Sequence, residues 1–203
     1  ANPTGTATAS ITARLITPSY TGGSKVYDGT ATATVTLGNV GLVAGDEVTV
    51  SQNATFTGAG AKNVGTGKAI AIDGITLAGA DAANYSLQST TAGTTGSITP
   101  RPVSVSGLGN LSAVDRVYDG TRNVQVVVSG ATGTASSSDF LAGDDVGIVV
   151  PGSGLGAGLM QDKNAGSNKA VAISGLSLSG ADAANYLITG TAGVTVNIAP
   201  RPA

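Results

Sequence analysis

The chain contains no cysteine, no histidine and no tryptophan among its 203 residues. Histidine and cysteine are the side chains that most often carry acid-base and nucleophilic chemistry near neutral pH, and no pair of carboxylates marks an evident catalytic pocket. We therefore expect a protein that is not an enzyme, without catalytic, cofactor-binding or metal-binding residues. The absence of cysteine leaves the compartment open, although large bacterial exoproteins that cross the outer membrane unfolded also avoid cysteine.

Charge is scarce as well. Charged residues make up 11% of the chain, against about 25% in an average globular protein. The net charge is -2, and the ten basic residues are scattered along the sequence, so a nucleic-acid partner is not expected. No run of about eighteen apolar residues is present, which argues against membrane insertion, and the N-terminus lacks the pattern of a signal peptide. We expect a fragment of a larger protein.

What the chain does contain is a duplication. The sequence K-V-Y-D-G-T at residues 25–30 returns as R-V-Y-D-G-T at residues 116–121, and G-A-D-A-A-N-Y at residues 79–85 is repeated without change at residues 180–186. A third pair, S-I-T-P-R-P at residues 97–102 and N-I-A-P-R-P at the C-terminal end, closes each copy. Tandem copies of this length predict two independent modules.

The module boundaries follow from these motifs. We expect a first domain at residues 1–100 and a second at residues 101–203, each long enough to bury its own core. Residues 10–15, S-I-T-A-R-L, resemble residues 97–102, so residues 1–14 are expected to be partly the tail of a preceding unit. The second copy is longer, and residues 130–138, rich in Gly, Ser and Thr, are expected to form a surface loop.

Strand patterns dominate both copies, because β-branched residues alternate with small or polar ones between glycine turns. The expected strands are residues 31–37, 47–50, 68–72 and 75–77, with counterparts at 123–128, 146–150, 169–173 and 176–178. Only one helical turn is expected in each copy, within the G-A-D-A-A-N-Y motif. The fold class is therefore predicted to be all-β. At the junction, Pro100 and Pro102 fix φ and lack N–H donors, so we expect a stiff link that does not pair into a sheet.

The pattern D-x-A-x-Y-x-apolar around Tyr85 and Tyr186 is similar to the tyrosine corner of immunoglobulin-like sandwiches, in which the hydroxyl bonds to upstream backbone. This favours two tandem Ig-like β-sandwich modules, in which residues 84–88 and 95–98 would pair as a hairpin. A β-grasp module is the alternative, since a strand pair, a helical turn and another strand pair leave similar traces.

The same motifs resemble the YDG-type repeats, related to MBG repeats, of large bacterial surface exoproteins such as filamentous-haemagglutinin-like adhesins. The resemblance covers essentially the whole chain in two copies. It implies a secreted or surface-attached protein whose partners are neighbouring repeats of the parent protein and, in a binding role, extracellular polysaccharide or a host or bacterial surface. It supplies no functional residues that map onto this chain.

The residues expected to matter are therefore structural. We expect Asp-Gly to form a tight turn with glycine at positive φ and the preceding tyrosine to fill core, rather than to form an exposed sugar-stacking patch. The structural motif residues are Tyr27, Asp28, Gly29, Asp81, Asn84, Tyr85, Tyr118, Asp119, Gly120, Asp182, Asn185 and Tyr186.

Two further candidate chemistries are weaker. Asp46 with Glu47, and Asp144 with Asp145, recur at equivalent places, but without a D-x-D-x-D-G series they are interpreted as solvated turns rather than calcium ligands. Lysines such as Lys68 and Lys169 recur too, and a Lys to Asn or Asp isopeptide bond would require a buried lysine beside an amide and an acid.

Two functions remain open at the level of sequence. The first is a rigid, non-catalytic stalk or spacer in a bacterial adhesin that acts in cell adhesion or biofilm formation. The second is a carbohydrate- or cell-surface-binding module of the same adhesin. An exposed aromatic cluster would favour the binding module, and a surface of Thr, Ser and Gly without one favours the spacer.

Overall fold

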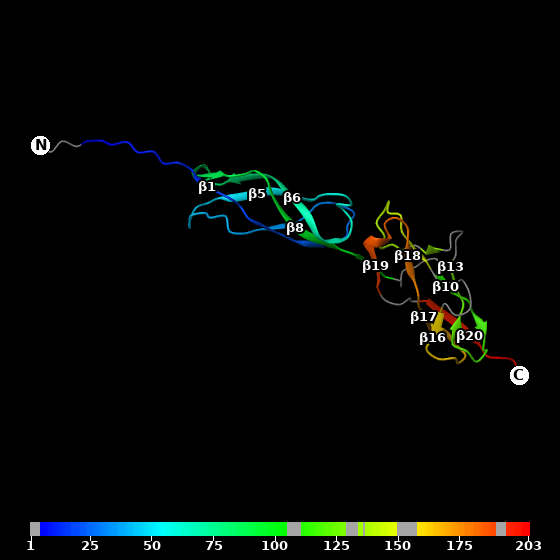
Figure 1. The fold of residues 1–203 in the computed structure, drawn as a ribbon. Coiled ribbons are helices and arrows are strands. Elements are labelled where there is room, and N and C mark those ends of the chain that lie inside the picture. The colour runs from blue at the N-terminus through cyan, green and yellow to red at the C-terminus, as the bar shows by residue number, and fades with distance from the viewer. Residues whose placement is uncertain (1–4, 105–110, 129–133, 136, 150–157, 190–193) are drawn as a thin grey trace. The chain divides into compact units, whose positions relative to one another are not determined.

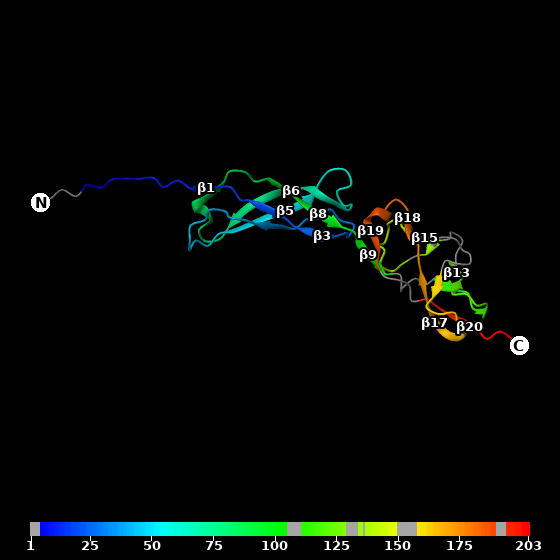
Figure 2. The same ribbon diagram turned by 60° about the horizontal axis from the view of Figure 1, so that its bottom comes forward.

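The computed structural model describes residues 5–104, 111–128, 134–135, 137–149, 158–189 and 194–203. Strands account for the regular structure of both copies (Figures 1 and 2). Helical structure in these residues is confined to two 3-10 turns, Ala82–Asn84 (η1) and Ala183–Asn185 (η3). The prediction of an all-β protein is confirmed.

The chain forms two units, defined by contacts within each. Unit 1 comprises residues 1–25 and 30–98, and unit 2 comprises residues 26–29 and 99–203. The main division thus falls next to the boundary expected after residue 100. The difference lies in residues 26–29, which belong to the first sequence repeat but to the second structural unit.

The strands of the first repeat are short except for two. They are β1 (Arg14–Ile16), β2 (Tyr20–Gly22), β3 (Ser24–Val26), β4 (Val35–Leu37), β5 (Thr49–Phe56), β6 (Gly65–Ala78), β7 (Tyr85–Leu87) and β8 (Ala92–Thr99). The principal sheet has the order β3-β8-β6-β5, and the pairs β1-β7 and β2-β4 form separate sheets. In β5 exposed positions alternate with more buried ones, ending at buried Phe56, which is the pattern of a half-buried strand.

The strands of the second repeat follow the same plan in smaller pieces. They are β9 (Arg101–Ser104), β10 (Leu111–Ala113), β11 (Arg116–Val117), β12 (Asn123–Val124), β13 (Val126–Val128), β14 (Thr134–Ala135), β15 (Gly147–Val149), β16 (Gly158–Met160), β17 (Gly166–Ile173), β18 (Ser177–Ser179), β19 (Tyr186–Thr189) and β20 (Val194–Ala199). The largest sheet has the order β11-β20-β17-β16-β12.

The two cores share some equivalent positions, such as Ile70 with Val171 and Ile98 with Ile198. Phe56, Ile70, Ile72 and Ile98 are almost fully buried in unit 1. In unit 2 the fully buried side chains include Val103, Val124, Val126, Ile148, Met160, Val171, Val196 and Ile198. Burial of these apolar side chains is the main stabilising term of each unit.

The expected hairpin between residues 84–88 and 95–98 is wrong. Strand β7 pairs in parallel with β1, with Arg14 opposite Tyr85, and β8 pairs antiparallel with β6. The backbone N–H of Ile75 in β6 donates to Thr90 O at 3.1 Å, so the connection after β7 is held against β6 rather than turned back. In unit 2, the parallel pair β9-β19 repeats this arrangement, with Arg101 opposite Tyr186.

Two other sequence expectations are corrected. Residues 68–72 and 75–77 do not form separate strands, because β6 runs through both with Gly74 at φ 60°. Of the expected loop at residues 130–138, Thr134–Ala135 form strand β14, which pairs with β15, while residues 130–133 and 136 lie outside the described residues.

The proline junction also pairs into a sheet, contrary to expectation. Pro102 lies in β9, opposite Leu187 of the parallel strand β19. The strand forms one side of a two-stranded sheet, where a residue without an N–H is tolerated on the unpaired edge. Arg101 Nε donates to Asp139 O at 2.7 Å, and the Ser104 N–H donates to Asp139 Oδ2 at 2.7 Å, which fixes β9 at both ends.

Candidate interaction site

The K/R-V-Y-D-G-T motif forms a closed turn in both copies. Lys25 Nζ donates to Thr30 O at 2.8 Å, and Arg116 Nη2 donates to Thr121 O at 2.9 Å. The glycines of the motif, Gly29 and Gly120, have φ of 76° and 81°. The prediction of a tight turn with glycine in the left-handed region is therefore confirmed.

The aspartate of this motif stabilises the turn. Asp119 Oδ1 accepts hydrogen bonds from the N–H and the hydroxyl of Thr121, both at 2.8 Å, and pairs with Arg116 at 2.6 Å. These hydrogen bonds and the Arg116 charge hold the pKa of the Asp119 carboxyl below its usual value. Asp28 occupies the equivalent place in the first copy.

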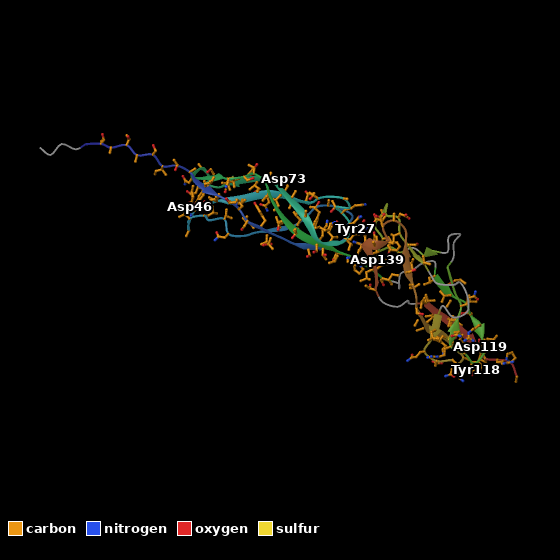
Figure 3. The ribbon with its side chains drawn as sticks, viewed as in Figure 1. Tyr27, Asp46, Asp73, Tyr118, Asp119 and Asp139 are labelled. Atoms are coloured by element: carbon orange, nitrogen blue, oxygen red, sulfur yellow. The ribbon has the colours of Figure 1, made fainter. Side chains whose placement is uncertain are left out.

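The tyrosines of the two turns have different surroundings. Tyr27 has no exposed surface, whereas Tyr118 is only half-buried. Figure 3 marks both side chains. The backbone N–H of each donates to the end of a strand, Tyr27 to Thr99 O at 2.9 Å and Tyr118 to Ala199 O at 2.8 Å. The core-filling prediction is thus confirmed for Tyr27, and neither ring is mostly accessible.

Tyr27 is buried in unit 2 because it joins a site built on Asp144. Its hydroxyl donates to Asp144 Oδ2 at 2.9 Å, and the hydroxyl of Tyr186 donates to the same oxygen at 2.6 Å. The two tyrosine rings pack edge to face with centroids 5.5 Å apart, and Phe140 packs edge to face on Tyr186 at 5.2 Å. Such aromatic pairs contribute roughly 0.5–1.5 kcal/mol beyond area burial.

The tyrosine of the G-A-D-A-A-N-Y motif also accepts a backbone hydrogen bond. Tyr186 receives the N–H of Leu141 at 3.0 Å, and Tyr85 receives the N–H of Val43 at 2.9 Å. Both rings are buried. This is the upstream backbone contact that the tyrosine-corner pattern predicts. In unit 1 the Tyr85 hydroxyl donates to Asp46 Oδ2 at 2.5 Å, so Asp46 occupies the place of Asp144.

The aspartate of the same motif holds the loop that carries these carboxylates. Asp81 Oδ2 accepts the N–H of Glu47 at 2.9 Å, and Asp182 Oδ2 accepts the N–H of Asp145 at 3.0 Å. The motif glycine must be glycine, because a Cβ at Gly180 would lie 2.2 Å from Asp145 O. The invariant letters of the motif therefore position the acidic loop against the buried tyrosine.

Asparagine precedes that tyrosine in both copies and ends the 3-10 turn. The Asn84 N–H donates to Asp81 O at 3.0 Å, and the Asn185 N–H donates to Asp182 O at 2.9 Å. Asn84 is exposed, whereas Asn185 is only 3% exposed. Asn84 and Asn185 therefore occupy equivalent positions but differ in solvent exposure.

Burial and the neighbouring aspartate carboxylate both raise the pKa of these tyrosine hydroxyls. Burial, followed by the hydrogen bond to Asp144, raises the pKa of Tyr27 and of Tyr186 above the ordinary value. The pKa of Tyr85 is also raised, with the hydrogen bond to Asp46 as the largest cause. The three hydroxyls therefore remain protonated donors at neutral pH.

The candidate metal ligands are occupied by these contacts. Asp46 and Asp144 each close a turn, as expected, through backbone N–H bonds to Val43 O and Leu141 O. Their carboxylates are half-buried and accept tyrosine hydroxyls, so the interpretation as solvated groups is wrong for these two residues. No group of three or more acidic side chains that could hold a metal ion occurs in the part of the chain that the structure describes. The recurring lysines lie elsewhere: Lys68 Nζ donates to Gly60 O at 2.9 Å, and Lys169 pairs with Asp162.

An open groove borders strands β11 and β20 in unit 2. It is lined by residues that include Asp115, Arg116, Asn197 and Pro200. The Asp115 carboxylate accepts both the backbone N–H of Asn197 at 2.7 Å and its side-chain amide at 2.8 Å. The acid in this groove is thus engaged in fixing β20.

Across the described ranges, no helix is long and apolar enough to span a membrane. Comparison with curated proteins and with solved structures found no match. The model of one family, the YDG domain, matches the chain twice, at residues 12–92 and 99–193. These matches contain both closed turns and both aspartate–tyrosine sites, and together they cover most of the chain. The chain therefore belongs to the YDG domain family and carries two tandem copies of that domain.

Proposed function

We propose that this chain is a non-catalytic repeat segment of a secreted or surface-attached bacterial adhesin, where it acts as a rigid spacer in cell adhesion or biofilm formation. The observation that carries the proposal is the tandem pair of YDG domains, each an all-β unit with its own buried core. A domain repeated along a chain adds length in steps of one module.

The surface chemistry supports a spacer over a binding module. All five tyrosines and both phenylalanines lie in the described part of the chain, and none of the seven is exposed. Exposed aromatic rings are the usual platforms on which sugars stack, so the alternative of a carbohydrate-binding module lacks its most common recognition element. The alternating exposed residues of β5, Thr49, Ser51, Asn53 and Thr55, present only small polar groups.

The proposal is tested by separating length from binding. The chain is inserted between a known binding domain and a cell-surface anchor, and capture of large beads is compared with that by a direct fusion. A spacer increases bead capture, and the isolated chain does not bind when screened against extracellular polysaccharides. Saturable binding of the isolated chain to a polysaccharide, with no effect of insertion on bead capture, would instead support the binding module.

A further inference from the structure

The aspartate–tyrosine site occurs in both units with matching geometry. In each, a tyrosine hydroxyl donates to an aspartate Oδ2, at 2.5 Å for Tyr85 on Asp46 and 2.6 Å for Tyr186 on Asp144. In each, the same hydroxyl accepts a backbone N–H, from Val43 or Leu141. The unit 1 site therefore contains an aspartate and a tyrosine equivalent to Asp144 and Tyr186, which Tyr27 contacts in unit 2.

Residues 27–29 make three kinds of contact within unit 2. The Tyr27 hydroxyl bonds to Asp144, the Tyr27 ring packs edge to face on Tyr186, and Gly29 lies close to the side chain of Leu141. A Cβ built at Gly29 would be 3.2 Å from Leu141 Cδ1. The site thus recognises a phenol followed by the tight Asp-Gly turn, which is the sequence of the Y-D-G-T motif.

The equivalent surface in unit 1 is open to solvent. Val43 is 49% exposed, whereas its counterpart Leu141 is half-buried. Asn84 is exposed, whereas Asn185 is 3% exposed. A carboxylate can accept about four hydrogen bonds, and Asp144 Oδ2 already accepts two hydroxyls. Asp46 therefore has the capacity to accept a second phenol.

A phenol of the right kind is also partly accessible to solvent. Tyr118 occupies the same closed turn as Tyr27, with Gly120 at φ 81°, but it remains half-buried. We propose that the Asp46–Tyr85 site binds the Y-D-G-T turn of another repeat copy, as the Asp144–Tyr186 site binds residues 26–29, and that Tyr118 is the corresponding ligand for a further copy. The occupant is thus a second copy of this chain or of its repeat.

This arrangement is directional. Each repeat offers a Y-D-G-T turn and an aspartate–tyrosine site as two different surfaces, so copies add head to tail. Within one polypeptide the effective concentration of the next site is high, and the same contact that is weak between separate chains becomes populated. The inference goes beyond the proposed function, because it holds whether or not the parent protein is an adhesin.

The test uses a tandem chain that joins residues 1–199 of one copy to residues 13–203 of a second, because Ala199 and Thr12 occupy equivalent places in their repeats. N-acetylimidazole, which acetylates accessible tyrosine hydroxyls, is the probe. An Arg122→Lys marker in the first copy distinguishes its tryptic peptide carrying Tyr118 from that of the second. Tyr27, which is buried in unit 2 of each copy, reports folding in every sample.

The proposal predicts that Tyr118 of the first copy is acetylated about tenfold more slowly than Tyr118 of the second, the ratio that ~1.4 kcal/mol of binding free energy produces. Val43→Glu in the second copy, at an exposed position, should abolish this protection, and so should Asp46→Ala. Asp73→Ala, which alters an exposed carboxylate of β6 in the same unit (Figure 3), should not. Equal acetylation of both Tyr118 residues, or protection that survives Val43→Glu and Asp46→Ala, would overturn the proposal.

Discussion

The ring of Tyr27 lies edge to face against the ring of Tyr186, with centroids 5.5 Å apart and planes inclined at 74°, although the two tyrosines come from different repeats of the sequence. Each ring directs its hydroxyl to the same oxygen of Asp144. The first sequence repeat therefore supplies a buried side chain of unit 2, the unit to which residues 26–29 belong.

The hydroxyl of Tyr27 can be tested separately from its ring. Tyr27→Phe retains the aromatic contact but removes the hydrogen bond to Asp144, so we expect a loss of about 1–2 kcal/mol in the free energy of unfolding of unit 2. Tyr118→Phe, at a half-buried position, is the matched control and should cost less. Urea titrations of both variants give the comparison, and equal losses would contradict it.

Asp182 is expected to be required for the acidic loop of unit 2. Asp182→Ala removes the acceptor of the Asp145 N–H, and we expect a loss of about 1 kcal/mol, the net contribution of one hydrogen bond at a solvent-exposed site. Asp81→Ala should have the same effect in unit 1, where the partner is Glu47 N–H. Thermal unfolding of each variant checks this, and an unchanged transition would show that the loop does not depend on the motif aspartate.

Close backbone approach at Gly79 gives a third prediction. A Cβ there would lie 2.1 Å from Glu47 O, whereas a Cβ at Gly45 would meet nothing within 4 Å, and both glycines have positive φ. Gly45→Ala should cost about 1 kcal/mol of stability through its backbone conformation alone. Gly79→Ala should cost about 1–3 kcal/mol more because of the clash. Denaturation midpoints that do not differ between the two variants would contradict the observed packing.

The fold class and the local structure of both motifs could be predicted from the sequence, because they depend on short sequence patterns. Alternating β-branched residues predicted the all-β class, the Asp-Gly turn predicted Gly29 at positive φ, and D-x-A-x-Y predicted a buried Tyr85 bonded to upstream backbone. The assignment of the units to Ig-like sandwiches rather than β-grasp modules stays a prediction.

What could not be predicted depends on distant partners. Nothing near Tyr27 in the sequence indicates that it contacts Asp144, and Asp46 looks like one more solvated turn residue. The available signal was the joint recurrence of an acid and a tyrosine, with Asp46 and Tyr85 separated by 39 residues and Asp144 and Tyr186 by 42. The strand order was missed for the same reason, because β8 forms its hydrogen bonds with β6 rather than with β7.

Alkaline pH should weaken both units. The pKa values of Tyr27, Tyr85 and Tyr186 are raised in the folded chain, so above the unfolded value of about 10 the unfolded state loses protons that the folded state retains. The stability from these groups is complete below about pH 10 and is lost as pH rises through the folded values. Stability measured by urea between neutral pH and pH 11 should fall, and a flat profile would contradict the raised values.

The central claim, that Tyr27 completes unit 2 rather than unit 1, is tested most directly by hydrogen exchange in the full-length Tyr27→Ala variant. Removing a buried aromatic ring costs about 3–5 kcal/mol in the unit that contains it. We predict faster amide exchange in β17, β19 and β20 of unit 2, with β5 and β6 of unit 1 unchanged. Faster exchange confined to β5 and β6 would contradict the account.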